Sequence, residues 1–189
     1  LSDERKPLDS IARDGGVRHT AVDGNNSYLK TTLAECIARL LGRNGLEAGD
    51  VRRCIAYGMI TSVMGLLEIP HVSAPASAQE LKNAMREQVF PEIAPFPITF
   101  IPGVRNFAAP VDLENFGMMD MMRGEETEAI GLYDLLGLKE KAMLVLPGSH
   151  NKFVAMSEEG KIIGCMTSIS GELLDAMTHH TILADAVGS

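Results

Sequence analysis

A turn of small and polar residues at 147–152 carries the clearest chemistry in the sequence. It reads Pro147-Gly148-Ser149-His150-Asn151-Lys152 and lies between two apolar segments typical of strands. A Gly-Ser turn exposes backbone N–H groups and a hydroxyl, which form a concavity that binds phosphate oxygens, and Lys152 can add positive charge. The alternative is an ordinary β-turn, because Pro-Gly is common turn chemistry. The Walker A pattern is absent from the sequence, so this segment is not a P-loop.

Two adjacent carboxylates, Glu125 and Glu126, stand where a helix is expected to begin. They belong to the segment Arg123-Gly124-Glu125-Glu126-Thr127. One of them can face a cleft while the other faces elsewhere, so the pair could supply a general base toward a hydroxyl. The alternative is structural, because the helix dipole favours acidic residues in the first turn. From the residues alone, the structural interpretation is the more common one.

A third segment, Gly58-Met59-Ile60-Thr61-Ser62, follows a short apolar strand predicted at 54–57. Ligands of α/β proteins gather at the carboxyl ends of strands, although a glycine turn with capping hydroxyls explains the same residues. His179 and His180 are adjacent and lack the i, i+4 spacing of a helical metal pair. No metal-binding residues are therefore predicted.

The elements that must position these residues alternate between strands and helices, with hairpins in between. Leu29, Leu33 and Ile37 recur at helical spacing, and Ser77 with Glu80 forms a capping-box pattern. This alternation favours an α/β fold with a mixed rather than a purely parallel sheet. Strands are predicted at 7–12, 54–57, 98–101, 142–146, 153–156 and 161–167. Helices are predicted at 27–41, at 77–89, from a start within 121–127 to about 136, and from 170 onward.

Composition excludes several classes of function. The 189 residues are 46% hydrophobic and 22% charged, which is typical of a globular protein. The net charge of −8 argues against a nucleic-acid groove, and no apolar run approaches the ~20 residues of a membrane helix. The three cysteines, Cys36, Cys54 and Cys165, are odd in number and lie in apolar surroundings. They predict reduced thiols in a cytoplasmic protein.

Several segments, taken together and in order, resemble one family. RGEET at 123–127, PGSHNKF at 147–153 and the stretch from Met166 to Leu173 are similar to segments of the 2-dehydro-3-deoxygalactonokinases. Further matches are Gly16-Val17-Arg18, the stretch from Gly58 to Gly65, and Ile101-Pro102-Gly103. The resemblance covers nearly the whole chain. It implies the α/β fold of the sugar kinase, Hsp70 and actin superfamily, with two ribonuclease-H-like lobes around a cleft, each a mixed sheet with flanking helices.

The resemblance also implies roles for individual residues. The turn becomes the second phosphate-binding hairpin, with Gly148, Ser149 and Lys152 against the nucleotide phosphates. The catalytic carboxylate of related kinases follows a glycine at a helix start, which matches Glu125, with Glu126 as the second candidate. Related kinases usually carry aspartate there. The remaining expected substrate-binding residues are Arg123, Gly58, Ser62 and Arg18, and the residue that holds the substrate carboxylate is left open among Arg18, Arg105 and Arg123.

The implied activity is ATP-dependent phosphorylation of 2-dehydro-3-deoxy-D-galactonate at its 6-hydroxyl, in galactonate breakdown. ATP and Mg²⁺ are the implied cofactors, and the sugar acid and ATP are the implied partners, with no nucleic acid and no membrane. The sequence indicates neither the oligomeric state nor which epimer of the sugar acid is preferred.

Two parts of the family pattern are not found in the sequence. A first phosphate hairpin of Asp-Gly-Thr type is expected upstream of Leu1, and the adenosine-binding glycines are expected after Ser189. We therefore expect most of lobe I in 1–138, the start of lobe II in 139–189, and no activity of this chain alone. A non-catalytic sensor of a sugar acid or a nucleotide is the alternative. A glycosidase is disfavoured, because its carboxylates must face each other across a substrate whereas Glu125 and Glu126 diverge.

Overall fold

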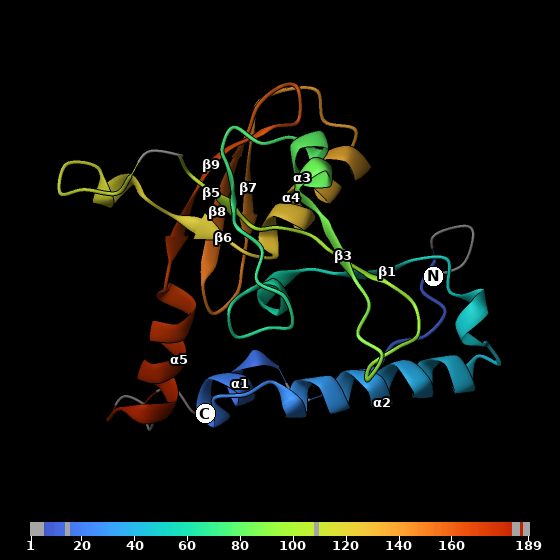
Figure 1. The fold of residues 1–189 in the computed structure, drawn as a ribbon. Helices are drawn as coiled ribbons and strands as arrows, with labels where there is room; N and C mark the ends of the chain where they lie inside the picture. The colour runs from blue at the N-terminus through green and yellow to red at the C-terminus, as the bar shows by residue number, and fades with distance from the viewer. Residues whose placement is uncertain (1–5, 14–15, 108–109, 183–185, 187–189) are drawn as a thin grey trace. The chain divides into compact units, whose positions relative to one another are not determined.

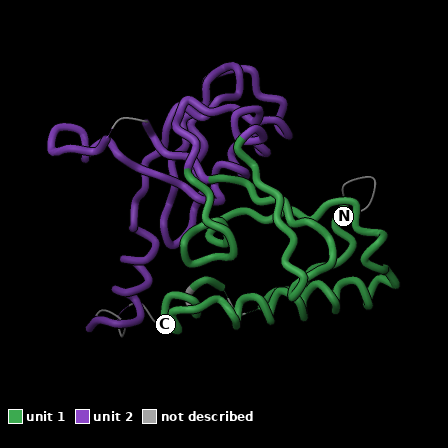
Figure 2. Tube along the Cα trace, viewed as in Figure 1, with its two compact units in different colours: residues 1–70, 84–102 green, residues 71–83, 103–189 purple. Residues whose placement is uncertain are grey.

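The computed structural model describes residues 6–13, 16–107, 110–182 and 186 (Figure 1). The chain divides into two compact units. The first comprises 1–70 and 84–102, and the second comprises 71–83 and 103–189 (Figure 2). Residues 103–138 thus fall in the same unit as 139–189. The expected lobes, which concern a complete kinase fold, stay a prediction.

The first unit is a long helix packed on a small sheet. Leu29 of α2 is buried with Ile98 and Phe100 of the central strand, and Leu33 and Ile37 pack against the same cluster. The helical spacing predicted from the sequence is therefore confirmed. The sheet has the order β1-β4-β3, with β1 parallel and β3 antiparallel to β4. The elements of the first unit are α1 (Val17–Asp23), α2 (Ser27–Arg43), β1 (Cys54–Ala56), β3 (Arg86–Gln88) and β4 (Ile98–Phe100), with 3-10 turns at Ala48–Asp50 and Gly58–Thr61.

Within its described residues, the second unit contains two three-stranded sheets together with helices. One sheet has the order β2-β5-β6 and the other the order β7-β8-β9. Val104 and Met122 of the first sheet share a buried core with Val154 and Cys165 of the second and with Ala129 of α4. The elements are β2 (Val72–Ser73), α3 (Ala78–Ala84), β5 (Val104–Arg105), a 3-10 turn (Phe116–Met118), β6 (Met121–Met122), α4 (Glu125–Leu135), β7 (Ala142–Leu146), β8 (Asn151–Met156), β9 (Ile162–Ser168) and α5 (Ser170–His180).

The mixed α/β class predicted from the sequence is confirmed, with corrections to individual elements. The predicted helix at 77–89 ends at Ala84, because Arg86–Gln88 pairs with β4 as a strand and tertiary pairing overrides local propensity. Its capping box is present, since the Ser77 N–H donates to Glu80 Oε2 at 2.8 Å. Residues 7–12 form no strand.

The strand at 142–146 is present, but only one of its faces packs against the core. Its continuous apolar run is typical of a strand buried on both faces, but Met143 and Val145 are more than half exposed within the described residues. Among these residues, no helix combines the length and the apolarity that crossing a membrane would require.

Candidate active site

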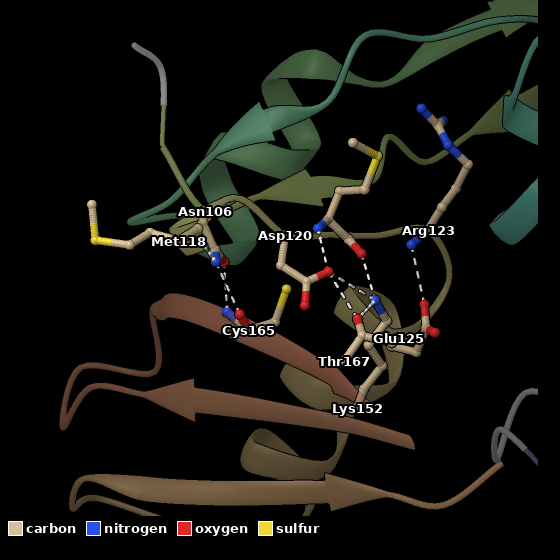
Figure 3. A network of polar contacts seen from close by, with 9 residues as sticks. Asn106, Met118, Asp120, Arg123, Glu125, Lys152, Cys165 and Thr167 are labelled. Carbon is tan, nitrogen blue, oxygen red and sulfur yellow. Dashed lines mark hydrogen bonds and ion pairs between the residues drawn. The ribbon is translucent and has the colours of Figure 1, made fainter. Parts of the chain in front are cut away.

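A sharp backbone turn between β6 and α4 fixes the carboxylate of Glu125. Gly124 has φ 131°, a conformation that favours glycine because it has no Cβ. The turn brings the Arg123 N–H to within 3.1 Å of Glu125 Oε2, to which it donates (Figure 3). Glu125 is partly exposed, so its carboxylate is held in position while it stays accessible.

The neighbouring Glu126 has a different environment. Its side chain is 0% exposed, and Oε2 accepts a hydrogen bond of 2.7 Å from the Gly124 N–H. The Thr127 hydroxyl donates to Oε1 at 3.2 Å. Burial raises the pKa of this carboxyl, against hydrogen bonds that lower it. Of the two adjacent carboxylates, Glu126 is fully buried against the helix start, whereas Glu125 is partly exposed.

The predicted phosphate turn is built against the start of α5. Asn151 Oδ1 accepts from the Gly148 N–H at 2.9 Å, and its Nδ2 donates to Ser170 Oγ at 2.6 Å. The Glu172 N–H donates to the Ser149 carbonyl at 2.9 Å. Asn151 was given no role from the sequence, because a contact back to the N–H three residues earlier is not a standard turn signal.

Gly171 is what allows this close approach. A Cβ at Gly171 would lie 2.1 Å from the Gly148 carbonyl oxygen and 2.9 Å from that of Ser149, so a side chain there would displace the turn. The backbone bond from Glu172 to Ser149 depends on the same short separation. Helix start and turn therefore form one unit, and the position of the turn is set by α5.

An open cavity of about 520 Å³ lies at this junction. Gly148 and Ser149, both predicted to bind phosphate, contribute to its wall. His150 Nε2 lies 2.9 Å from Glu172 Oε2 at its edge. The lining residues are Gly148, Ser149, His150, Gly171, Glu172 and Asp175.

Lys152, the third residue predicted to bind phosphate, is placed elsewhere. It lies on the buried face of β8 and is not among the residues that line the cavity. Its ammonium donates to the Met121 carbonyl at 2.5 Å and to the Thr167 hydroxyl, and it lies 3.4 Å from Asp120 Oδ1 (Figure 3). A lysine ammonium has three donors. All three are used within the protein, and the contact of Lys152 with phosphate stays a prediction.

The same network extends along β9 to Asn106. The Asn106 amide donates to the carbonyls of Met118 and Cys165 at 2.8 and 2.9 Å, and it accepts from the Cys165 N–H at 2.7 Å (Figure 3). Thr167 in turn donates to Asp120 Oδ1 at 2.8 Å. These contacts tie the segment that leads into β6 and α4 to the strand that follows the hairpin. Sequence reasoning missed both Asn106 and Asp120, because their contacts with β9 join residues that lie 47 to 59 positions apart.

The predicted substrate residues are spread over both units. Arg123 belongs to the second unit, where its Nη2 lies 3.2 Å from His71 Nδ1. Gly58 and Ser62 belong to the first unit, at the two ends of the 3-10 turn after β1. Gly58 has φ 82°, and the Ser62 hydroxyl donates to the Met59 carbonyl at 2.7 Å. Arg18 lies in α1, and its side chain falls outside the described residues.

Comparison with a solved structure shows which fold the chain adopts. The whole chain superposes with a TM-score of 0.74 and 24% identity on 55% of the crystal structure of a candidate 2-dehydro-3-deoxygalactonokinase from Sinorhizobium meliloti. The two chains thus share a mixed α/β fold. The sequence profile of the 2-keto-3-deoxy-galactonokinases matches residues 1–189. The chain belongs to the 2-keto-3-deoxy-galactonokinase family, as its sequence resemblance predicted.

A curated relative agrees with this membership. A protein of Rhizobium meliloti named as a candidate 2-dehydro-3-deoxygalactonokinase is 32% identical over 135 residues, which cover 70% of this chain. The matched segment covers 40% of that relative, so the chain spans less than half of the relative's length in the alignment.

Proposed function

We propose that this chain supplies the catalytic carboxylate and one phosphate-binding turn of an ATP-dependent kinase that acts on 2-dehydro-3-deoxygalactonate. The observation that carries the proposal is the contrast between the two carboxylates at the start of α4. Glu125 is accessible and held by the Arg123 N–H, whereas Glu126 is fully buried. Membership of the family supports the kind of reaction.

In this proposal, Glu125 orients the 6-hydroxyl of the sugar acid and accepts its proton as the oxygen attacks the γ-phosphate. General bases of this kind must lie within hydrogen-bond reach of the proton that they remove. The phosphoryl group passes in line between the two oxygens, so the protein acts chiefly by positioning and by stabilising charge. The buried Glu126 contributes by fixing the helix start on which Glu125 stands.

The turn at 147–150 is proposed to receive the phosphates of ATP. Its position is determined by Asn151 and by the close contact with Gly171. Backbone N–H groups of such turns bind phosphate oxygens without reorganising. Gly148 and Ser149 are the proposed contacts of the phosphates, with the Ser149 N–H and hydroxyl as the donors, because the Gly148 N–H already donates to Asn151 Oδ1. Arg123, Gly58, Ser62 and Arg18 remain the proposed contacts of the sugar acid.

The residues around the turn also suit a magnesium ion bound with the nucleotide. Glu172 and Asp175 line the cavity beside the turn. Mg²⁺ is usually held by one or two carboxylates together with substrate phosphates, and these two side chains supply such oxygens. When bound, the ion would neutralise negative charge on the phosphates. Without it, the two carboxylates would repel the nucleotide.

The proposal extends to the fold of the complete protein. We propose the ribonuclease-H-like, two-lobed organisation of the sugar kinases, with lobe I ending near residue 138. The β7-β8 hairpin with its phosphate turn and α5 then opens lobe II. The hairpin order β7-β8-β9 followed by α5 supports this assignment.

A kinase assay on the full-length gene product tests the proposal. ADP release is measured with Mg-ATP and a panel of 2-keto-3-deoxy sugar acids, for the parent and for Glu125→Gln. We expect turnover on the galactonate-derived acid and a fall in kcat of about 10²- to 10⁴-fold in the variant, because the general base is lost. Glu128→Gln removes an exposed carboxylate from the same helix and is the matched control.

Three other results would lead to different conclusions. Turnover that survives Glu125→Gln would keep the kinase and remove the base from Glu125. ATP binding without turnover on any acid would favour a sensor. The absence of both ATP binding and turnover would contradict the proposal as a whole.

A further inference from the structure

One face of the β2-β5-β6 sheet carries two arginines, Arg105 and Arg123, and the reaction chemistry above does not specify which group of the substrate they would contact. Val72, Val104 and Met122 lie side by side across this sheet, and Val104 and Met122 are buried in the core. Because successive residues of a strand point to opposite faces, the neighbours of these three residues lie on the face turned away from that core. These neighbours are His71, Ser73, Gly103, Arg105, Met121 and Arg123.

Each arginine of this face contacts a polar side chain from β2 or from the residue that directly precedes β2. Arg105 is paired in register with Ser73, and its Nε donates to the Ser73 hydroxyl at 3.1 Å. The Arg123 Nη2 lies 3.2 Å from His71 Nδ1. A guanidinium can only donate, so Nδ1 is the acceptor and the imidazole is neutral, with its proton on Nε2.

Gly103 makes the contact between His71 and Arg123 possible. Continuing the register of β5 and β6 by one residue places Gly103 between His71 and Arg123. A Cβ at Gly103 would lie 2.7 Å from His71 Cδ2 and 3.0 Å from Nε2, so the ring lies directly over the glycine. The His71 Nε2 is buried and has no hydrogen-bond partner within the part of the chain that the structure describes. An orphaned polar atom is costly, which indicates that the position of this ring serves another purpose.

Two positively charged groups act on the His71 ring of this face. Burial, followed by the nearby Arg123 and Arg105 guanidinium groups, lowers the pKa of His71 to about 4. Both guanidinium groups therefore lie near the same ring. Arg105 and Arg123 are diagonal neighbours in the antiparallel pair β5-β6. Residues in this relation are about 7–8 Å apart. Among the described residues, no carboxylate forms an ion pair with Arg105, and Figure 3 shows the Arg123 side chain extending away from Glu125.

We propose that Arg105 and Arg123 together bind the carboxylate of the sugar acid, and that Ser73 and His71 hold the two guanidinium groups in position. Guanidinium groups match carboxylates with paired N–H donors. The inference rests on the proposed function, because it assigns the other end of the same substrate.

The geometry of Arg123 connects this anion site with the proposed base. Its backbone N–H holds the Glu125 carboxylate, whereas its side chain carries the guanidinium to the sheet face. An extended arginine side chain and an extended six-carbon acid have similar lengths. A carboxylate at the guanidinium thus leaves the 6-hydroxyl, at the opposite end of the substrate, in the neighbourhood of Glu125. Of the three arginines that the sequence left open, this arrangement selects Arg105 and Arg123.

Direct binding measurements on the full-length gene product test the inference without relying on turnover. Isothermal titration calorimetry compares 2-dehydro-3-deoxygalactonate with the analogue that carries a C1 alcohol in place of the carboxylate. We expect the parent to bind the acid more tightly. Arg105→Gln and Arg123→Gln should each weaken binding of the acid by about 10- to 100-fold, while binding of the alcohol changes little. Arg105→Lys should recover part of the loss.

Arg39→Gln, which changes an exposed arginine of α2, is the matched control, and thermal unfolding of each variant confirms that it folds. Equal affinity of the parent for acid and alcohol would overturn the inference. Arginine variants that weaken ATP binding instead would overturn it in favour of a phosphate site. Binding that follows the expected pattern, with no phosphate transfer, would leave the inference standing and contradict the proposed function.

Discussion

Glu126 illustrates how burial separates two chemically identical neighbours at the scale of the residue. Its pKa is raised by burial, so the folded state holds the proton more tightly than the unfolded chain does. The contribution of this group to stability is complete below the unfolded pKa, about 4.3, and is lost as the pH rises through the folded pKa. The Glu126→Gln variant has no ionisable group at this position, so it does not lose this stability as the pH rises. A glutamine carbonyl can still accept from the Gly124 N–H.

We therefore expect the stability of Glu126→Gln, relative to that of the parent, to increase between about pH 4 and pH 8. Urea unfolding of both proteins across this range measures the difference. Glu128→Gln removes an exposed carboxylate from the same turn of α4 and should show no comparable trend. A relative stability of Glu126→Gln that falls as the pH rises would contradict the assignment of Glu126 as a buried cap.

Two elements, the turn at 147–150 and α5, are in contact so close that a single methyl group should separate them. A Cβ at position 171 would meet backbone oxygens of Gly148 and Ser149. We expect Gly171→Ala to raise KM for ATP by about 10- to 100-fold, because the phosphate turn is displaced, and to destabilise the protein by about 1–3 kcal/mol. Steady-state kinetics and urea unfolding provide the two measurements.

Gly131→Ala provides the matched control for this substitution. Gly131 lies within α4, and a Cβ there would meet no atom within 4 Å. Alanine should stabilise the helix by about 0.5–1 kcal/mol and leave KM for ATP unchanged. A Gly171→Ala protein with the kinetics of this control would show that the turn does not bind the nucleotide.

The Lys152 side chain on β8 connects this strand to β6 and β9 through hydrogen bonds. Its replacement provides a second prediction at the scale of elements. Lys152→Met leaves Asp120 without its cation and Thr167 without its donor. We expect a loss of about 2–3 kcal/mol in the free energy of unfolding, since a mostly buried charge becomes unpaired. Lys161→Met, at an exposed position before β9, should cost much less.

The double variant Lys152→Met, Asp120→Asn distinguishes the two roles of Lys152. Removing both charges should restore part of the stability, because no unpaired charge remains. A Lys152→Met protein that is as stable as the parent but binds ATP poorly would instead support the direct phosphate contact predicted from the sequence.

For the molecule as a whole, the sequence predicted the features that local patterns determine. The apolar spacing of α2, the capping box at Ser77 and the hairpin at 157–160 are all present. The start of α4 was also predictable, because the helix directly follows Gly124, which has a positive φ. Short range in the sequence and strong local chemistry are what these features share.

Features that depend on distant pairing could not be predicted. The two-residue strands β2, β5 and β6 have too few residues for a periodic pattern, and they exist only because they pair with one another. The same limit applies to the candidate site. The Glu125–Glu126 pair could be recognised in the sequence, but which of the two is buried depends on the core of the second unit. The pairing of Arg123 with His71, 52 positions away, left no local signal.

The most direct test of the central claim is the identity of the product. Full-length parent and Glu125→Gln proteins are incubated with Mg-ATP and 2-dehydro-3-deoxygalactonate, and the sugar acid is followed by phosphorus NMR and mass spectrometry. We expect the parent to form the 6-phosphate and the variant to form it at least about 100-fold more slowly. An unphosphorylated sugar acid after incubation with the parent, or equal rates of product formation by the two proteins, would contradict the account.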